Sequence, residues 1–162
     1  MGIGQDSHRF VAEDVEKDLV LGGYTLPGEM GMEGNSDADI LLHSLCNAIS
    51  SVTGVIILGK IADQMCAAGI TDSSRYLEKA LETLENNPGE RRFRLDSIAF
   101  TIEGKKPKLL KHIESIRHNI ADLCGLSIHD VGITATTGEG LTDFGKGLGL
   151  QAFCYITCVE ED

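Results

Sequence analysis

The sequence predicts an α+β fold: a sandwich of one mixed β-sheet with helices packed on one of its faces, containing ferredoxin-like βαβ elements. Two observations lead to this prediction. Segments with alternating apolar residues stand at both ends of the chain, and segments with apolar residues at helical spacing lie between them. The length of 162 residues is about one domain's worth, and no repeat or linker divides it, so residues 1–162 are expected to form a single domain.

The first half of the chain is expected to supply a strand, a hairpin and two helices. Their predicted positions are a strand over 1–10, a hairpin over 17–28 that turns at Gly22-Gly23, a helix from Ser36 to Gly54, a loop with a short helical piece over 55–72 and a helix over 73–86. Ser36 is the predicted N-cap of the first helix, with Asp39 at the capping-box position. The inward stripe of this helix is Leu41, Leu45, Ala48 and Val52.

The second half is expected to complete the sheet. Its predicted elements are a strand over 95–103, a loop at 105–108, a helix over 109–124 that ends at Gly125, a strand over 130–137, a glycine-rich segment over 138–149 and a last strand over 150–160. The last strand carries apolar residues on both faces. We therefore expect it to lie between two layers, made by helices or by a neighbouring subunit.

The composition excludes several classes of partner. A net charge of −11 should repel nucleic acid and anionic lipid surfaces. No apolar run approaches the roughly 20 residues of a membrane span, and the start of the chain does not resemble a signal peptide. The five cysteines form no C-x-x-C pair and are odd in number, so neither a zinc knuckle nor a disulfide framework is expected. A reducing, cytoplasmic location is the prediction.

One group of residues suggests a metal site. Asp6 and His8 stand two apart in a predicted strand, so their side chains share one face. Such a pair usually marks a solvated polar face, and a lone helical histidine such as His43 is usually a core residue. One strand and one helix can nevertheless bring the three together. Two imidazoles and a carboxylate suit a borderline metal such as Zn²⁺, and three protein ligands leave a fourth position open, as catalytic sites do.

Asp37 and Asp39 have a competing explanation. Acidic residues in the first turn of a helix offset the positive end of its dipole, which is the simpler interpretation for Asp37. Asp39 lies four residues before His43 on the same helix face, so it could instead orient a ligating histidine.

A second group of residues suggests phosphate binding. Thr136 and Thr137 precede a glycine-rich segment, and hydroxyls with close backbone N–H groups suit phosphate. Glu139 could hold a hard divalent cation, and Lys146 could neutralise phosphate charge. A flexible surface loop is the alternative. The basic segment 105–108 is normally a solvated patch, although on an acidic protein it could receive an anionic substrate.

Taken together, these residues resemble the 2-C-methyl-D-erythritol 2,4-cyclodiphosphate synthase family of the non-mevalonate isoprenoid pathway. The match runs essentially end to end. It rests on Asp6-x-His8, on "SDADILLH" ending at His43, on "KPKLL" at 106–110 and on "ATTGEGL" at 135–141.

The resemblance implies a homotrimer with its sheets around a threefold axis and an active site at each subunit interface. It implies Zn²⁺ on Asp6, His8 and His43, and Mg²⁺ or Mn²⁺ on Glu139 and the substrate diphosphate. The implied substrate is 4-diphosphocytidyl-2-C-methyl-D-erythritol 2-phosphate. Its 2-phosphate attacks the β-phosphorus, which closes the cyclic diphosphate and releases CMP.

The resemblance also implies a set of substrate-binding residues. Asn35 and Ser36 are placed near the diphosphate, Asp63 near the methylerythritol hydroxyls, and Thr136, Thr137 and Lys146 near the cytidylyl phosphates. The cytidine pocket is assigned, largely through backbone, to Lys106, Pro107, Lys108, Leu109 and Leu110.

The chain departs from the family pattern at four places. Family members often have His at Asn35 and Arg at Lys146. Residues 55–65 differ from the usual loop, and residues 71–75 differ from the usual Lys-x-x-Asp-Ser pattern. The altered segment 55–75 keeps one alternative open, a non-cyclising trimeric metal- and nucleotide-binding homologue. A metal-dependent phosphohydrolase is a second alternative, because open zinc sites and phosphate-binding loops also serve hydrolysis.

Overall fold

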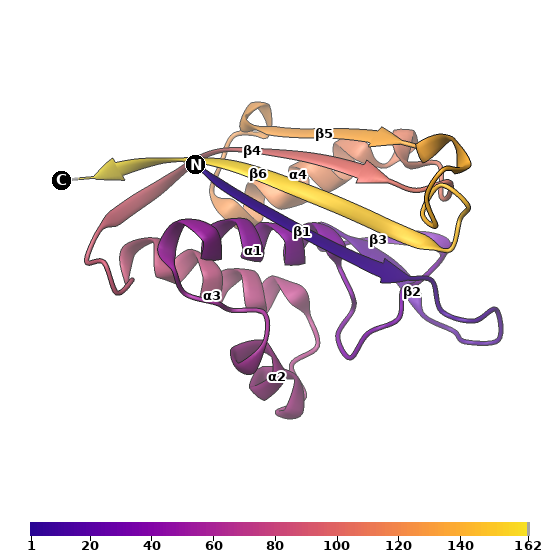
Figure 1. Cartoon of the computed structure of the whole chain (residues 1–162), viewed down its shortest axis with the longest axis horizontal. Coiled ribbons are helices and arrows are strands. Elements are labelled where there is room, and N and C mark those ends of the chain that lie inside the picture. Colours follow the sequence, from indigo (N-terminus) through magenta and orange to yellow (C-terminus); the bar gives the residue numbers. More distant parts are fainter. Residues whose placement is uncertain (162) are drawn as a thin grey trace.

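The computed structural model describes residues 1–161 and contains one four-stranded mixed sheet (Figure 1). The strands of this sheet, in spatial order, are β1 (Gly2–Arg9), β6 (Gly149–Glu161), β4 (Arg92–Glu103) and β5 (Val131–Thr136). β6 runs antiparallel to both β1 and β4, whereas β4 and β5 are parallel. A separate hairpin is formed by β2 (Asp18–Leu21) and β3 (Tyr24–Met30). The prediction of an α+β fold with a mixed sheet is confirmed.

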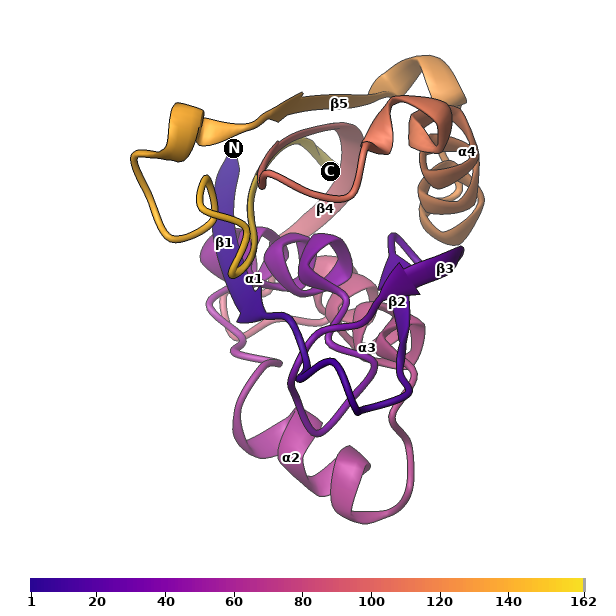
Figure 2. The ribbon, with the colours of Figure 1, turned by 90° about the vertical axis from the view of Figure 1, so that its right-hand side faces the viewer.

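Four α-helices complete the described part of the chain: α1 (Ile40–Thr53), α2 (Lys60–Ala67), α3 (Ser73–Glu85) and α4 (Ile113–Cys124). α1 packs on β1 and β6, α3 packs on α1 and β4, and α4 packs on β5. Figure 2 shows α1 and α3 on the same side of the sheet, with α2 furthest from it. α4 connects the parallel strands β4 and β5, which makes the βαβ unit expected from the sequence. Within residues 1–161, no helix has the length and apolar character needed to cross a bilayer.

Glycines in β1 allow α1 to lie unusually close to the sheet. A Cβ atom at Gly4 would meet the carbonyl oxygen of Ser44 at 2.0 Å, and one at Gly2 would meet the carbonyl oxygen of Ala48 at 2.3 Å. Any larger residue would push the helix away. This close approach sets the distance between β1, which carries Asp6 and His8, and α1, which carries His43.

The two faces of β6 differ in what covers them. Leu150, Ala152, Cys154 and Ile156 point into the core and are completely buried. The alternate residues Phe153 and Tyr155 remain 43% and 42% exposed on the opposite face of the sheet. The expected inner layer is therefore made by helices. The other apolar face has no covering layer within residues 1–161.

Two predicted helix starts are wrong. Asp39, rather than Ser36, is the N-cap of α1: its carboxylate accepts the N–H groups of Leu41 and Leu42. Ser36 Oγ instead accepts the N–H of Ala38, whose φ of 60° interrupts the helical path. The segment predicted as one helix over 109–124 begins with a 3₁₀ turn at Leu109–Lys111, and α4 starts only at Ile113.

Candidate metal and substrate site

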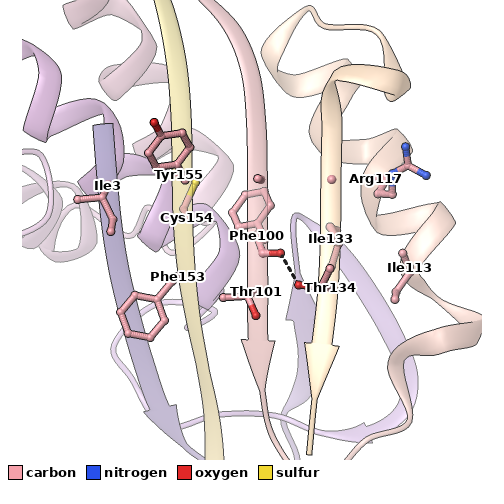
Figure 3. A pocket seen from close by; sticks show the side chains of 12 residues that line it. Ile3, Phe100, Thr101, Ile113, Arg117, Ile133, Thr134, Phe153, Cys154 and Tyr155 are labelled. Carbon is pink, nitrogen blue, oxygen red and sulfur yellow. Dashed lines mark hydrogen bonds between the residues drawn. The ribbon is translucent and has the colours of Figure 1, made fainter. Parts of the chain in front are cut away.

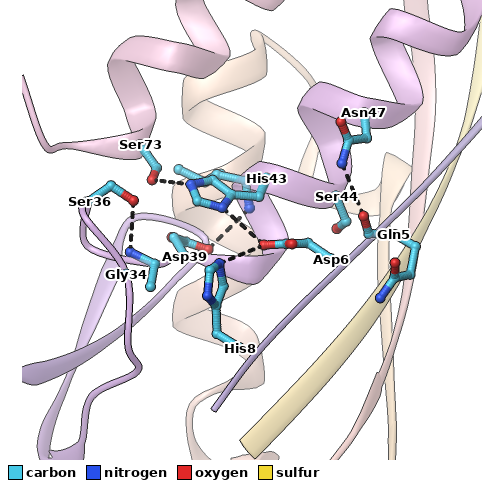
Figure 4. A network of polar contacts seen from close by, with 12 residues as sticks. Gln5, Asp6, His8, Gly34, Ser36, Asp39, His43, Ser44, Asn47 and Ser73 are labelled. Carbon is cyan, nitrogen blue, oxygen red and sulfur yellow. Dashed lines mark hydrogen bonds and ion pairs between the residues drawn. The ribbon is translucent and has the colours of Figure 1, made fainter. Parts of the chain in front are cut away.

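Asp6, His8 and His43 lie together where β1 passes the start of α1 (Figure 4). Oδ2 of Asp6 is 3.1 Å from Nε2 of His8 and 3.0 Å from Nδ1 of His43. One ligand atom from each residue lies within 4.8 Å of the others. The structure thus brings together the three residues that the sequence singled out, from a strand and a helix that are far apart in the chain.

The charge state of the cluster suits a cation. Burial alone would raise the pKa of Asp6, but hydrogen bonds and charge attraction from His43 and His8 in their protonated forms outweigh it and lower the pKa to about 2. The hydrogen bond to Asp6 raises the pKa of His8, although burial opposes this. Asp6 and His8 are half-buried, His43 is buried, and all three line an open pocket. A carboxylate and two imidazoles are the donor set of a three-ligand zinc site. The residues present therefore fit such a metal.

This charge state makes metal affinity depend on pH. A metal needs the neutral imidazole of His8, and Asp6 holds a proton there at a pH above the ordinary pKa of 6.5. We expect zinc affinity to fall by about tenfold for each pH unit below the raised pKa of His8. Competition with a zinc indicator between pH 5.5 and 8.5 measures this dependence. An affinity that stays constant over this range would contradict the ligand assignment.

Asp39 fixes the start of α1 against the hairpin. Besides capping the helix, its carboxylate accepts the N–H of Gly22 at 2.9 Å and of Gly23 at 2.6 Å. Both glycines have positive φ, 62° and 72°, as the tight turn requires. Burial raises the pKa of Asp39 to about 6, although the four N–H donors favour its ionised form.

The roles expected for Asp37 and Asp39 are therefore corrected. The side chain of Asp39 contacts the hairpin turn and its own helix, so it does not orient His43. Asp37 lies before the helix and accepts the backbone N–H of Ser73 at 2.9 Å. Its carboxylate binds Ser73 of α3, so its role is more specific than that of an acid that offsets the helix dipole.

A pocket of about 250 Å³ opens beside the cluster. Asn35 and Ser36 line it from the loop before α1, and Asp63 and Cys66 line it from α2, together with Tyr76 of α3. Three of the predicted substrate residues, Asn35, Ser36 and Asp63, thus share one pocket with the cluster. Sequence analysis missed Cys66, Tyr76 and Ser73; α2 and the start of α3 lie in the segment that departs from the family pattern.

The remaining predicted residues do not line this pocket in the described chain. Thr136, Thr137 and Glu139 are exposed where β5 leads into a glycine-rich turn, and Glu139 has a φ of 51°. Lys146 lies further along the same segment and pairs with Asp143 at 3.2 Å. The segment 106–110 is exposed except for half-buried Pro107 and buried Leu109. One chain therefore holds the candidate residues in two separate groups.

Glu103 organises the second group. Its side chain accepts a hydrogen bond from the hydroxyl of Thr142, and it lies so close to Gly138 that a Cβ there would meet it at 2.1 Å. The turn that carries Glu139 is thus folded over the end of β4. The sequence did not predict this contact, because a glutamate at the end of a strand, such as Glu103, is common and has no distinguishing pattern around it.

The fold and the cluster together define an α+β protein with three residues that can hold a metal ion beside a pocket. The chain belongs to the YgbB family, whose model matches residues 1–159. It is similar to the 2-C-methyl-D-erythritol 2,4-cyclodiphosphate synthases of Chlamydia felis, at 48% identity over 161 residues, and of Chlamydia trachomatis serovar D, at 45%. The alignments cover 99% of this chain and 89% and 88% of those proteins. The family thus places the chain among the cyclodiphosphate synthases.

Solved structures agree with this placement. A CDP-bound structure of 2C-methyl-D-erythritol-2,4-cyclodiphosphate synthase matches with a TM-score of 0.78 and 26% identity, covering 98% of this chain and 99% of that one. The bifunctional IspDF from Campylobacter jejuni matches with a TM-score of 0.81 and 27% identity. The alignment covers 99% of this chain and 42% of that longer protein.

Proposed function

We propose that the chain, as a single domain over residues 1–162, converts 4-diphosphocytidyl-2-C-methyl-D-erythritol 2-phosphate to 2-C-methyl-D-erythritol 2,4-cyclodiphosphate and releases CMP. The observation that carries this proposal is the Asp6–His8–His43 cluster beside a pocket, in a chain of this family. A cytoplasmic location is part of the proposal, and the five free thiols fit a reducing compartment.

The cluster is proposed to bind Zn²⁺ next to the reacting phosphates. When bound, the cation would act as a Lewis acid and reduce the repulsion between two phosphate groups. Asp6, His8 and His43 would fix its position from a rigid strand and helix, which aligns the two groups for attack. Ser36 Oγ accepts the N–H of Ala38, so its own proton is free to be donated to a diphosphate oxygen, and Asn35 offers an amide beside it.

Asp63 is proposed to bind the hydroxyls of the methylerythritol unit. It is exposed in the first turn of α2 and lines the same pocket as the metal cluster. A carboxylate accepts two hydroxyl donors well. The helix α2 would in this way replace the usual family loop.

A homotrimer is proposed to join the two groups of site residues, with the sheets around a threefold axis. The uncovered face of the sheet supports this, because it holds an apolar groove of about 540 Å³ (Figure 3). Ile3, Ile133, Phe153 and Tyr155 line the groove. Sedimentation equilibrium should give three times the chain mass of 17.4 kDa, whereas a monomeric mass would refute this assembly.

The second group of residues would then complete the site of a neighbouring subunit. Glu139, with the substrate diphosphate, is proposed to hold Mg²⁺ or Mn²⁺. Thr136, Thr137 and Lys146 are proposed to contact the cytidylyl phosphates. The cytidine would lie against the backbone of residues 106–110, in keeping with the CDP bound by a solved relative.

Phosphorus NMR of the purified protein with substrate, Zn²⁺ and Mg²⁺ tests the proposed reaction. Cyclic diphosphate together with CMP is the expected result. Binding without turnover would instead indicate a non-cyclising homologue, and linear hydrolysed products would indicate a phosphohydrolase.

Replacing Lys146 with alanine is expected to weaken substrate binding. A charge-assisted hydrogen bond to phosphate is worth about 1.5–3 kcal/mol, so KM should rise by about tenfold or more with kcat little changed. Lys79→Ala is the matched control, because Lys79 is also exposed and also pairs with an acid three residues away. Steady-state kinetics measure both variants, and an unchanged KM would remove Lys146 from the site.

A further inference from the structure

A serine and an aspartate stand behind His43, on the side of its ring that faces away from Asp6. Nε2 of His43 lies 2.9 Å from Oγ of Ser73, which is completely buried (Figure 4). The carboxylate of Asp37 accepts the backbone N–H of Ser73 at 2.9 Å through Oδ2, and it accepts the Ser73 hydroxyl through Oδ1. Asp6, His43, Ser73 and Asp37 therefore form one continuous chain of polar contacts.

The protons in this chain can be counted. An ionised carboxylate only accepts hydrogen bonds, and a serine hydroxyl has one proton to donate. The Ser73 proton is therefore directed to Asp37, which leaves the oxygen of Ser73 as an acceptor. The contact between Ser73 Oγ and Nε2 of His43 is then satisfied only if Nε2 carries a proton. The neutral imidazole is held as its Nε2–H tautomer, with Nδ1 free.

Asp6 alone would favour the opposite tautomer. Its Oδ2 lies 3.0 Å from Nδ1 of His43, where it would accept a charge-assisted hydrogen bond from an Nδ1–H group. A proton at that position would block the ligand atom that faces Asp6 and His8. Asp6 and the Ser73–Asp37 pair therefore compete for the position of the His43 proton.

We propose that Ser73 and Asp37 are positioning residues that select the Nε2–H tautomer of His43 and so keep Nδ1 open as a metal ligand. This inference rests on the metal site of the proposed function. Histidine ligands commonly donate their second N–H to an oxygen acceptor, which fixes the tautomer and the ring orientation. Here the acceptor is the hydroxyl oxygen of Ser73. This oxygen is available as an acceptor because the hydroxyl proton is donated to the carboxylate of Asp37.

Both positioning residues are anchored by backbone contacts. The N–H of Asp37 donates to the carbonyl of Thr71 at 2.9 Å, and Asp37 Oδ1 accepts the N–H of Asp39 at 3.2 Å. Ser73 is the first residue of α3, whose N-cap is Asp72. The pair thus connects the loop before α1 to the start of α3, and its geometry is set by two helices.

Nitrogen-15 NMR of the histidine rings tests the tautomer directly. In the metal-free wild-type protein at pH 8.5, the His43 signals should show the Nε2–H pattern, and an Nδ1–H pattern would overturn the proposal. In Asp37→Asn, the new amide can donate to Ser73 Oγ and release the hydroxyl proton toward Nε2. The tautomer should then change to Nδ1–H, which a purely structural role of Asp37 would not produce.

Cobalt binding, followed by visible absorption, tests the consequence for the metal. Both Asp37→Asn and Ser73→Ala should bind Co²⁺ about 10–100-fold more weakly than the wild type. Ser74→Ala, at the half-buried next position, is the matched control and should bind Co²⁺ as the wild type does. Wild-type affinity in the Ser73 and Asp37 variants would overturn the proposal. If Ser73→Ala does not fold, the cobalt affinity of Asp37→Asn and the nitrogen-15 spectrum of the wild-type protein still test the proposal.

These readouts are independent of turnover. A protein that shows the expected tautomer and cobalt affinities but does not form the cyclic product would refute the proposed reaction and leave the positioning pair in place. A competent synthase whose Ser73 and Asp37 variants retain wild-type cobalt affinity would refute only the positioning pair.

Discussion

Replacing His43 with alanine is expected to remove the metal and to lower turnover by about a thousandfold. The metal's Lewis acidity contributes several kcal/mol to charge stabilisation, and each 1.36 kcal/mol corresponds to a factor of ten in rate. His43 is 8% exposed and points toward the pocket rather than into the aliphatic core, so the variant should remain folded. Metal analysis of the purified variant, read beside its kcat, measures the effect.

His118→Ala is the matched control for this experiment. His118 is an exposed histidine on α4, remote in the chain from the metal cluster, so its loss should leave metal content and kcat unchanged. A His43→Ala protein that retains a full complement of metal would show that Asp6 and His8 bind it with other ligands. The assignment of the three-ligand site would then be wrong.

The part of the site that the sequence predicted is the part that depends on local periodicity. Asp6 and His8 are two apart in a strand, and that spacing alone places both side chains on one face. His43 needed only a correctly predicted helix. The close approach of α1 to β1, permitted by Gly4, then brought the three together.

The N-cap was predicted wrongly because the sequence offers several residues that can cap a helix. Ser36, Asp37 and Asp39 all have side-chain acceptors, and local preference does not separate them. The choice is made by a distant element: the hairpin turn supplies the N–H groups of Gly22 and Gly23, which only Asp39 reaches. The contact between Asp37 and Ser73 was missed for the same reason, since the two are 36 residues apart.

The second group of residues shows another kind of information that a single sequence does not contain. Glu139 and Lys146 were placed in the site by resemblance, and the structure holds them outside the pocket that contains Asp6. No pattern within one sequence states which residues would act on a neighbouring copy in the proposed trimer. The apolar outer face of β6 was the only sequence signal that pointed toward a neighbouring subunit.

Asp39→Ala is expected to be the most destabilising substitution near the site, with a loss of about 3 kcal/mol or more. It removes an N-cap, which costs about 1 kcal/mol. It also leaves the buried N–H of Gly22 without an acceptor, at about 1–3 kcal/mol, and it removes a second hydrogen bond to the carboxylate, from the part-buried N–H of Gly23. Urea unfolding measures the loss. Asp72→Ala is the matched control, because Asp72 caps α3 at an exposed position through one N–H and should cost only about 1 kcal/mol.

Asp39 should also leave a signature in the pH dependence of stability. Its pKa is raised from 3.8 to about 6 in the folded protein, so the folded state binds the proton more tightly than the unfolded state does. The contribution of this tighter proton binding to the free energy of unfolding is fully present below pH 3.8 and is lost as the pH rises through 6. Asp6 acts in the opposite direction: its pKa of about 2 gives stability above pH 3.8 that is lost as the pH falls toward 2.

Asp39→Asn separates the two contributions. Asparagine still caps a helix but does not titrate, so the loss of stability between pH 4 and pH 6 should be smaller in this variant than in the wild type. Urea unfolding of both proteins at pH 4, 5, 6 and 7 measures the difference. Parallel pH profiles would mean that the four N–H donors hold Asp39 ionised throughout this range, and that their hydrogen bonds outweigh the cost of burying its charge.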